Sequence, residues 1–559
     1  MSSKRKKAKQ FTRRQIILLL AVVLVISVPL IRRAVHPYRY IKSSTETLTV
    51  KIPYSAGDEA KVKVLTLTRG TRVELRQQGE SESLVKYKDM EFNVDNDHLA
   101  SSLEDCVQVS YVYPRRLINL QTTKSGKLSA KVVKKGEKVK VTEVKTEDLD
   151  RRTGAISWYR VEKGAKQYWL NGEEVETSKS AAMKNYAANV EYSDYWDQEY
   201  GDGYSKKAYI KQVDYKPRKL KEYKSNPIKE DVNSVHTTLQ NLVKHKDYFL
   251  SLNDKTSINS ITVEIKGDGG PVYYESDVVD DYLKDPDKAQ TETVVTKKEM
   301  KELMKEFQDD GYYMIARIVT FKDSIFAKQN KSEAITDKDG DLIKVNDEYW
   351  PSAYSRKAWM YNVDIAKEAA KCNFNEIQFD YCRFPDGTAT IQDELDMQNK
   401  YNESKVAAIQ GFLTYAHHEL ESYKVYVAAD IWAWPVVAQD DQDIGQFFPA
   451  IANAVDVVCP MAYTDLFASG AMDIDDPVSH PEKTLYKFNK RVKQQMNTIE
   501  SDAVVRNWIR GYDYSTSEIK AQIRGINRAG YEGYLVWYGN GNPYQLRKIQ
   551  KGFISSKIE

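Results

Sequence analysis

Two different periods of apolar and polar residues follow one another along the chain. Between residues 47 and 180 apolar and polar positions alternate, for example over 62–78 and 83–94, which predicts half-buried antiparallel strands. From 228 to 555 short apolar runs alternate with stretches of helical period, which predicts βαβ units and a parallel sheet. We therefore expect a small all-β region followed by a large α/β domain.

The α/β region holds eight strand-like runs, the number that closes a barrel. Helices are expected between them, at 297–309, 361–371 and 517–529. A doubly wound open sheet is the alternative, but it would favour fewer strands and a Gly-rich phosphate loop, and no GxGxxG or Walker sequence is present. The predicted fold is a (β/α)8 TIM-type barrel. The runs are 232–237, 258–267, 312–321, 375–381, 424–434, 455–463, 504–512 and 532–539.

The all-β region divides into two units of similar design, 47–105 and 106–180. The second contains 131–144, with a turn at Gly136, and 156–176. Between this unit and the barrel, residues 181–227 have little periodicity and are expected to form an irregular lead-in.

The N-terminus predicts a membrane anchor. Residues 1–14 carry seven Lys or Arg and no acidic residue, and the apolar run 16–31 that follows has no charge. We expect a basic cytoplasmic tail at 1–14, a transmembrane signal anchor at 15–33 and a linker at 34–46. A cleaved signal peptide is the alternative, although no A-x-A-like site follows the run. The expected location is the cell membrane, single-pass, with the C-terminal bulk extracytoplasmic.

Overall charge and cysteine content exclude some partners. Lys plus Arg number 83 and Asp plus Glu 80, so there is no basic field of the kind that nucleic-acid binding needs. Nucleic acid is therefore not an expected partner. The four cysteines have neither CxxC spacing nor disulfide-scaffold density and are interpreted as buried thiols: Cys106, Cys372, Cys382 and Cys459.

Two aspartates are the candidate catalytic pair. Active sites of (β/α)8 barrels lie at the C-terminal ends of the strands, where alternation points Asp380 of the fourth run and Asp430 of the fifth into the barrel. Strands about 4.8 Å apart would let one carboxylate act as nucleophile or base and the other, protonated, as acid. Glycosidic bond cleavage needs such a pair. Helix capping by a strand-end Asp is the structural alternative.

Polar side chains of the second and third runs are candidates for binding sugar hydroxyls. Glu264 and Lys266 have inward phase, and Asp268 lies on the following loop. Arg317 also has inward phase, and a buried Arg without a carboxylate would be costly, so we expect it to pair with Glu264 or Asp380.

Aromatic residues at the strand ends offer flat faces for pyranose rings, although core packing is as common a role. Arg383 follows Asp380 closely and either keeps a carboxylate ionised or forms a structural ion pair. His236 is more often a buried histidine than a base. The aromatic candidates are Trp432, Trp434, Tyr463 and Trp537.

No cofactor is indicated by the sequence. HExxH, HxH and GxSxG sequences are absent, so zinc hydrolysis and elbow-type serine chemistry lack support. Asp268, Asp386 and 440–443 leave room only for an adventitious calcium.

The region from about 226 to 551 resembles the putative glycosyl hydrolase domain family of uncharacterised bacterial proteins. Its most specific stretch is E-I-Q-F-D-Y-x-R-F-P at 376–385. The resemblance implies a (β/α)8 barrel, a site centred on Asp380 and a wall or polysaccharide context, without naming a substrate. The chain departs from it after Tyr463, where Asp465 becomes a substitute polar group or local acid. Further matching stretches are 258–270, 314–323, 427–434, 441–446, 456–463, 504–514 and 521–544.

The two β units resemble bacterial SH3-type domains, with the second the better match because of its K-K-G-E turn and W-Y-R-V strand. Spacer modules without a ligand are the alternative. We therefore expect a membrane-anchored glycoside hydrolase acting on a polysaccharide or peptidoglycan-type glycan. A non-catalytic carbohydrate-binding barrel, or a structural protein that acts only through the β units, are the alternatives.

Overall fold

The computed structural model describes residues 38–56, 59–193 and 212–554. The predicted cytoplasmic tail and signal anchor lie outside these residues, as does part of the irregular lead-in. Within the described ranges, no helix is long and apolar enough to cross a membrane. The described chain forms two compact units: one runs to Ala182 apart from 115–119 and 125–135, and the other comprises those two segments and the chain from Met183 onward.

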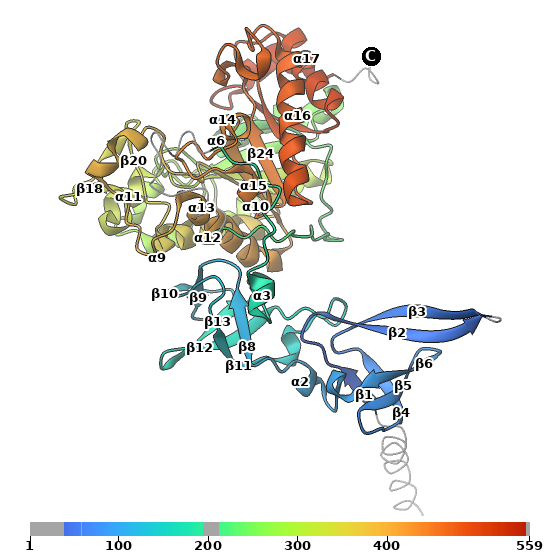
Figure 1. The fold of residues 1–559 in the computed structure, drawn as a ribbon. Coiled ribbons are helices and arrows are strands. Elements are labelled where there is room, and N and C mark those ends of the chain that lie inside the picture. Colours follow the sequence, from blue (N-terminus) through green and yellow to red (C-terminus); the bar gives the residue numbers. More distant parts are fainter. Residues whose placement is uncertain (1–37, 57–58, 194–211, 555–559) are drawn as a thin grey trace, which may run out of the picture. The chain divides into compact units, whose positions relative to one another are not determined.

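The first unit is all-β and fits the pair of SH3-like domains expected from the sequence (Figure 1). Its first sheet has the strand order β6-β5-β4-β1-β7, and β2 and β3 form a separate hairpin. The strands are β1 (Tyr38–Ile41), β2 (Thr47–Ala56), β3 (Glu59–Thr68), β4 (Arg72–Gln77), β5 (Glu82–Tyr87), β6 (Met90–Asp95) and β7 (Leu99–Ala100).

Strand β1 falls in the segment expected as a linker. It joins the sheet because Ile41 is fully buried against Val73 and Val85. In the second part of the unit, strands follow in the order β13-β12-β11-β8-β14 within a larger sheet. They are β8 (Tyr111–Pro114), β11 (Val139–Glu143), β12 (Trp158–Lys163), β13 (Lys166–Asn171) and β14 (Val175–Glu176).

The second unit contains a closed parallel barrel, which confirms the predicted (β/α)8 fold. Its sheet order is β23-β21-β17-β16-β15-β27-β26-β24-β25, and the pairing of β23 with β24 closes it. Arg506 divides the seventh strand into β25 and β26. The strands are β15 (Asn233–Thr238), β16 (Ser260–Lys266), β17 (Tyr313–Val319), β21 (Glu376–Asp380), β23 (Tyr426–Trp432), β24 (Val457–Met461), β25 (Val504–Val505), β26 (Asn507–Arg510) and β27 (Tyr534–Trp537).

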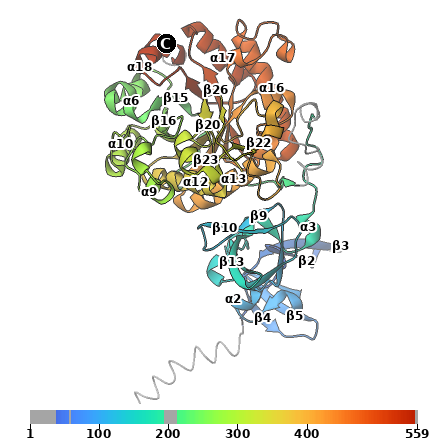
Figure 2. The same ribbon diagram turned by 90° about the vertical axis from the view of Figure 1, so that its left-hand side faces the viewer.

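Helices surround the strands in Figure 2. Two of them cover predicted helical stretches and a third ends one residue before the end of the predicted stretch 517–529, and each buries an apolar face against the outside of the barrel. The helices include α6 (Leu239–Lys244), α10 (Lys297–Asp309), α12 (Arg356–Lys371), α13 (Lys405–Leu420), α16 (Pro481–Ile499) and α17 (Thr516–Arg528).

The fourth strand shows how alternation divides the two sides of the barrel wall. Ile377 and Phe379 of β21 pack in the large apolar layer shared with the helices. Gln378 donates its amide to Cys459 Sγ at 3.4 Å, across the barrel interior. The inward phase predicted for Gln378 is therefore confirmed, and it carries the side chain of Asp380 to the same side.

The opposite end of β21 is anchored by a buried ion pair. Arg506 Nη1 donates to both carboxylate oxygens of Glu376 at 2.8 and 3.0 Å, and the Tyr313 hydroxyl donates to the same carboxylate at 3.1 Å. Glu376 and Arg506 are fully buried. This cluster fills the N-terminal end of the barrel, so the polar groups there serve the fold.

A bulge in β16 changes one predicted orientation. The pairing of β16 with β17 shifts between Glu264 and Lys266, which inserts an extra residue and redirects Lys266. Lys266 lies over the ring of Tyr361 in α12 and pairs with Asp323 at 2.8 Å. The prediction that Lys266 faces the barrel interior with Glu264 is wrong.

Candidate active site

Six strands deliver polar or aromatic side chains to one cluster toward their C-terminal ends. Asp380 and Asp430 each directly follow the last register pair of β21 and β23, Phe379 with Ala429, and Arg317 and Glu264 are register partners in β17 and β16. Strand pairing alone therefore brings together three carboxylates and one guanidinium. The cluster consists of His236, Glu264, Arg317, Asp380, Asp430 and Trp508.

Arg317 is the centre of this cluster. Its Nη1 donates to Glu264, its Nη2 donates to Asp380, and its Nε donates to Asp380 Oδ2 at 3.1 Å. The same Nε lies 4.0 Å from Asp430 Oδ2. The expected pairing of Arg317 is confirmed, and it involves both carboxylates that the sequence offered rather than one.

Glu264 is held as an anion. Burial opposes its ionisation, but Arg317 and the nearby His236 outweigh burial and lower the pKa of Glu264. His236 Nε2 lies 3.3 Å from Glu264 Oε2, and the Tyr273 hydroxyl donates to Oε1 at 3.4 Å. Burial lowers the pKa of His236 against the pull of Glu264. A neutral imidazole beside an ionised Glu264 follows.

Asp430 lies in the opposite electrostatic setting. It is fully buried, and burial followed by the charge of Asp380 raises its pKa well above the usual range. Trp508 Nε1 donates to Asp430 Oδ1 at 2.7 Å. Among the described residues, Oδ2 has no hydrogen-bond partner. Asp430 is therefore suited to the role of a protonated acid.

The carboxyl groups of the two aspartates lie near the same nitrogen of Arg317. Asp380 Oδ2 and Asp430 Oδ2 lie 3.1 and 4.0 Å from one nitrogen, Arg317 Nε. They are therefore at most about 7 Å apart, a limit that is compatible with both the retaining and the inverting separations.

The backbone after Asp380 has an uncommon conformation. Tyr381 has a φ of +48°, in the left-handed region that non-glycine residues seldom adopt. Its N–H donates to Asp380 Oδ1 at 2.6 Å. Both oxygens of Asp380 thus accept hydrogen bonds, one from this amide and one from Arg317, and its orientation is fixed.

The remaining predicted polar residues lie around this cluster in ion pairs of their own. Arg383 pairs with Asp386 at 3.0 Å and lies over the ring of Trp432, which favours its structural interpretation. Asp268 pairs with Lys322 at 2.7 Å. These carboxylates, which were considered for an adventitious calcium, have cationic partners instead.

Tyr463 and Asp465 connect the sixth and seventh strand ends. Burial, and then the charges of Asp380 and Asp430, raise the pKa of Tyr463 well above its usual value. Asp465 accepts from the Tyr512 hydroxyl at 2.9 Å with both oxygens and lies 4.0 Å from Arg510 Nε. The carboxylate of Asp465 therefore links two loops. Its hydrogen bonds to Tyr512 argue against the role of a local acid that the sequence suggested for it.

Replacing Tyr512 with Phe tests this link. The variant loses the hydroxyl that bonds Asp465 and is expected to lower the free energy of unfolding by about 1 kcal/mol in a urea titration. Tyr531→Phe is the matched control, because burial is the only influence on its hydroxyl and raises its pKa to about 12. Equal effects of the two substitutions would contradict the link.

Two participants were missed or undervalued by the sequence analysis. Trp508 has inward phase in the predicted seventh run, like Arg510, and this alternation was the available signal. His236 was weighed mainly as a buried histidine. It lies 4.4 Å from the Trp537 ring, which also lies 5.3 Å from the Arg317 guanidinium, so Trp537 covers the cluster.

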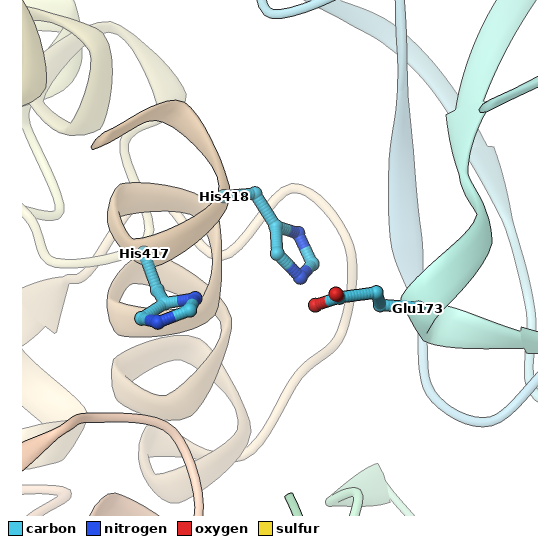
Figure 3. Close-up of side chains that lie close together, drawn as sticks. All are labelled: Glu173, His417 and His418. Atoms are coloured by element: carbon cyan, nitrogen blue, oxygen red, sulfur yellow. The ribbon is translucent and has the colours of Figure 1, made fainter. Parts of the chain in front are cut away.

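His417, one of two adjacent histidines in α13, serves the fold. Figure 3 shows His417 and His418 on consecutive positions of α13. His417 Nε2 lies 3.2 Å from Asp456 Oδ1, which Arg218 also contacts at 3.2 Å. Burial opposes ionisation of Asp456, but His417 and Arg218 hold its pKa well below the usual range. Burial lowers the pKa of His417, so its contact with Asp456 is a hydrogen bond of a neutral imidazole, and it joins α13 to the residue that precedes β24.

Comparison with known proteins identifies one family. The family model described as a putative glycosyl hydrolase domain matches residues 234–544. No functionally curated protein matches the chain.

A hypothetical protein from Ruminiclostridium thermocellum has 28% identity and a TM-score of 0.30, over 35% of this chain and 96% of its own. The PgaB (BpsB) glycoside hydrolase domain from Bordetella bronchiseptica has 13% identity and a TM-score of 0.40, over 58% and 99%. The Flavobacterium johnsoniae chitobiase has 10% identity and a TM-score of 0.39, over 58% and 48%.

Proposed function

Because the chain belongs to the family of putative glycosyl hydrolase domains, whose model spans most of its barrel, we propose that it hydrolyses glycosidic bonds. One observation carries the proposal: Asp380 is paired with a guanidinium, while the neighbouring Asp430 is buried with a raised pKa. A carboxyl group of raised pKa beside a second carboxyl group that a cation orients is an arrangement that can supply the acid and the nucleophile or base.

In this mechanism Asp430 protonates the departing glycosidic oxygen, and Asp380 acts as nucleophile or activates a water. Arg317 holds Asp380 by two donors. Glu264 balances the charge of Arg317, and Trp537 offers a ring face beside the cluster for a pyranose. We assign sugar binding at the edge of the site to Trp432, Tyr463 and Asp268.

The proposed substrate is a cell-envelope or extracellular polysaccharide, including peptidoglycan-type glycans. The basic segment 1–14 followed by the apolar run 16–31 supports a single-pass anchor with the barrel outside the cell. The all-β unit supports attachment near the wall, as the SH3-like resemblance implies. This setting brings the barrel to glycans without requiring it to be secreted freely.

A non-catalytic carbohydrate-binding barrel is the second candidate. It is favoured by the ion pairs themselves, since Arg317 occupies the Asp380 oxygen that a nucleophile would use. The purified protein should therefore be tested on a panel of wall, capsule and exopolysaccharide glycans, both for hydrolysis and for binding by calorimetry. Binding without any product on the same glycan would favour this candidate over the enzyme.

Asp430→Asn tests the acid role. The protonated form of Asp430 is needed, so turnover of the wild type should fall as the pH rises through the raised pKa of this group. The variant is expected to lose about 10²–10⁴-fold in kcat. It should also lack the fall in turnover at high pH, the alkaline limb of the pH–rate profile. The measurement is a pH–rate profile on the glycan found in the panel.

Asp440→Asn is the matched control for that variant. Asp440 is a buried acid whose pKa burial also raises, but its carboxylate accepts from Gln442 and lies outside the cluster. It should keep the alkaline limb of the wild type. A limb that vanishes in Asp440→Asn and persists in Asp430→Asn would assign the acid elsewhere.

A further inference from the structure

Asp430 has two oxygens in different surroundings. Oδ1 accepts the indole N–H of Trp508 at 2.7 Å. Oδ2 lies 4.0 Å from Arg317 Nε and has no hydrogen-bond partner within the described part of the chain. Asp430 is fully buried and Trp508 is 1% exposed. Bulk water therefore does not supply a hydrogen bond to Oδ2 that would make the two oxygens alike.

An indole nitrogen can donate a hydrogen bond but cannot accept one. Oδ1 must therefore supply a lone pair to Trp508 whether the carboxyl is charged or neutral. In the neutral form, the carbonyl oxygen is the better acceptor, so the oxygen that bonds Trp508 keeps carbonyl character and the hydroxyl proton belongs on the other oxygen. That other oxygen is Oδ2, on the side of Arg317 and Asp380.

We propose that Trp508 is a positioning residue that keeps the proton of Asp430 on Oδ2 by donating its indole N–H to Oδ1. The role of this proton in catalysis rests on the function proposed above, whereas its location does not. The step it prepares is simple: the Oδ2–H bond breaks as the glycosidic oxygen takes the proton, and its electron pair remains on Asp430 as a carboxylate.

The other groups around Asp430 do not provide this orientation. Within the described residues, none of them donates a hydrogen bond to either of its carboxyl oxygens. Gln446 donates to the main-chain oxygen of Asp430 at 3.1 Å, and the Cys382 thiol lies 3.6 Å from that same oxygen. The charged and titratable groups that act on the carboxyl are Asp380, Arg317, Glu376, Cys382, Cys459 and Tyr463.

Infrared spectroscopy can locate the proton without any turnover. The C=O stretch of a neutral carboxyl moves to higher wavenumber when its carbonyl oxygen loses a hydrogen bond. The Asp430 band is identified at neutral pH as the one missing from Asp430→Asn. In Trp508→Phe this band is expected at higher wavenumber, and its disappearance on raising the pH is expected to begin at a higher pH than in the wild type.

The direction of the pH shift follows from charge. An N–H donor bonds a carboxylate more strongly than a neutral carboxyl, so Trp508 lowers the pKa of Asp430 against burial and Asp380. Removing the donor leaves the neutral form favoured to a higher pH. A tryptophan that only filled space would leave both the band position and its pH dependence unchanged.

Trp359→Phe is the matched control. Trp359 is also buried and donates its indole N–H at 2.8 Å, but to the main-chain oxygen of Ala353. Its replacement should not move the Asp430 band. If Trp508→Phe does not fold, replacement of Trp508 by β-(3-benzothienyl)alanine keeps the ring size and removes only the N–H.

The outcomes separate this inference from the proposed function. An Asp430 band that is absent at every pH at which the protein is folded, or that does not move when the N–H of residue 508 is removed, overturns the inference. A band that shifts as expected in a protein that hydrolyses no glycan supports the inference and contradicts the enzyme proposal. Hydrolysis together with an unmoved band contradicts the inference alone.

Discussion

Asp380→Asn is expected to reduce glycan hydrolysis by at least about 10³-fold in kcat. The substitution removes the charge that would attack the sugar or activate water. An asparagine oxygen can still accept from the Tyr381 amide or from Arg317, so the side chain should keep its place. The measurement is kcat on the glycan identified in the panel.

Stability should change much less than activity in this variant. Arg317 keeps its bond to Glu264, so its guanidinium is not left without an anion. The thermal transition of Asp380→Asn is therefore expected close to that of the wild type. Asp386→Asn, in the loop that follows β21 and paired with Arg383, is the matched control and should retain hydrolysis.

Unchanged turnover in Asp380→Asn would remove Asp380 from the reaction. If turnover is lost as expected, the anomeric configuration of the first product, followed by proton NMR, distinguishes retention from inversion. The carboxyl separation of at most about 7 Å accommodates either outcome, so only the product can decide between them.

Arg317→Met is expected to have the largest effect on stability, a loss of roughly 3–5 kcal/mol in the free energy of unfolding. The substitution leaves Glu264 and Asp380 buried without their cation. Hydrolysis should be lost as well, because the orientation of Asp380 depends on two donors of the guanidinium. Urea unfolding at pH 7 measures the first effect.

The pH dependence of this loss has a definite sign. In the wild type the pKa of Glu264 is lowered, so its contribution to stability is present above the unfolded-state pKa and disappears as the pH falls through the folded-state value. In Arg317→Met the largest influence that lowers the pKa of Glu264 is gone, and only His236 and Tyr273 still oppose burial, so the pKa of this carboxyl is expected to rise. Acidification from pH 7 to pH 5 should therefore reduce the difference in the free energy of unfolding between Arg317→Met and the wild type.

Arg524→Met provides the comparison for an exposed pair. Arg524 binds Glu482 at 2.9 Å with 57% of its side chain exposed. Its loss should cost less than about 1 kcal/mol at either pH. A cost for Arg317→Met that is similarly small, or that grows on acidification, would contradict the described role of Arg317.

The barrel was predictable from the sequence because its signal is local. Buried parallel strands are short apolar runs, and all eight predicted runs contain strands of the barrel. The alternation of Gln378 and Asp380 against Ile377 and Phe379 follows from strand geometry alone. The pairing of Arg317 was predictable as well, since a buried guanidinium requires an anion.

Features that depend on one extra residue or on distant loops were not predictable. The bulge in β16 adds a residue that cannot be recognised from the residue types of the strand. It turns the side chain of Lys266 toward α12 instead of the site. The hydrogen bond between Asp465 and Tyr512 joins two loops that are far apart in the sequence, so it depends on how these loops pack together. The bond from Trp508 to Asp430 joins strands that are not neighbours in sequence or register.

The five-residue strand β21 carries a structural carboxylate at one end and the candidate reactive carboxylate at the other. Four residues at about 3.3 Å each fix Asp380 roughly 13 Å from Glu376. Arg506 donates a hydrogen bond to each carboxylate oxygen of Glu376. A shift in the register of β21 against its neighbouring strands would break both hydrogen bonds. The length of β21 therefore sets the distance between the two carboxylates. The position of Asp380 along the barrel axis is fixed by the ion pair of Glu376 at the N-terminal end of the barrel.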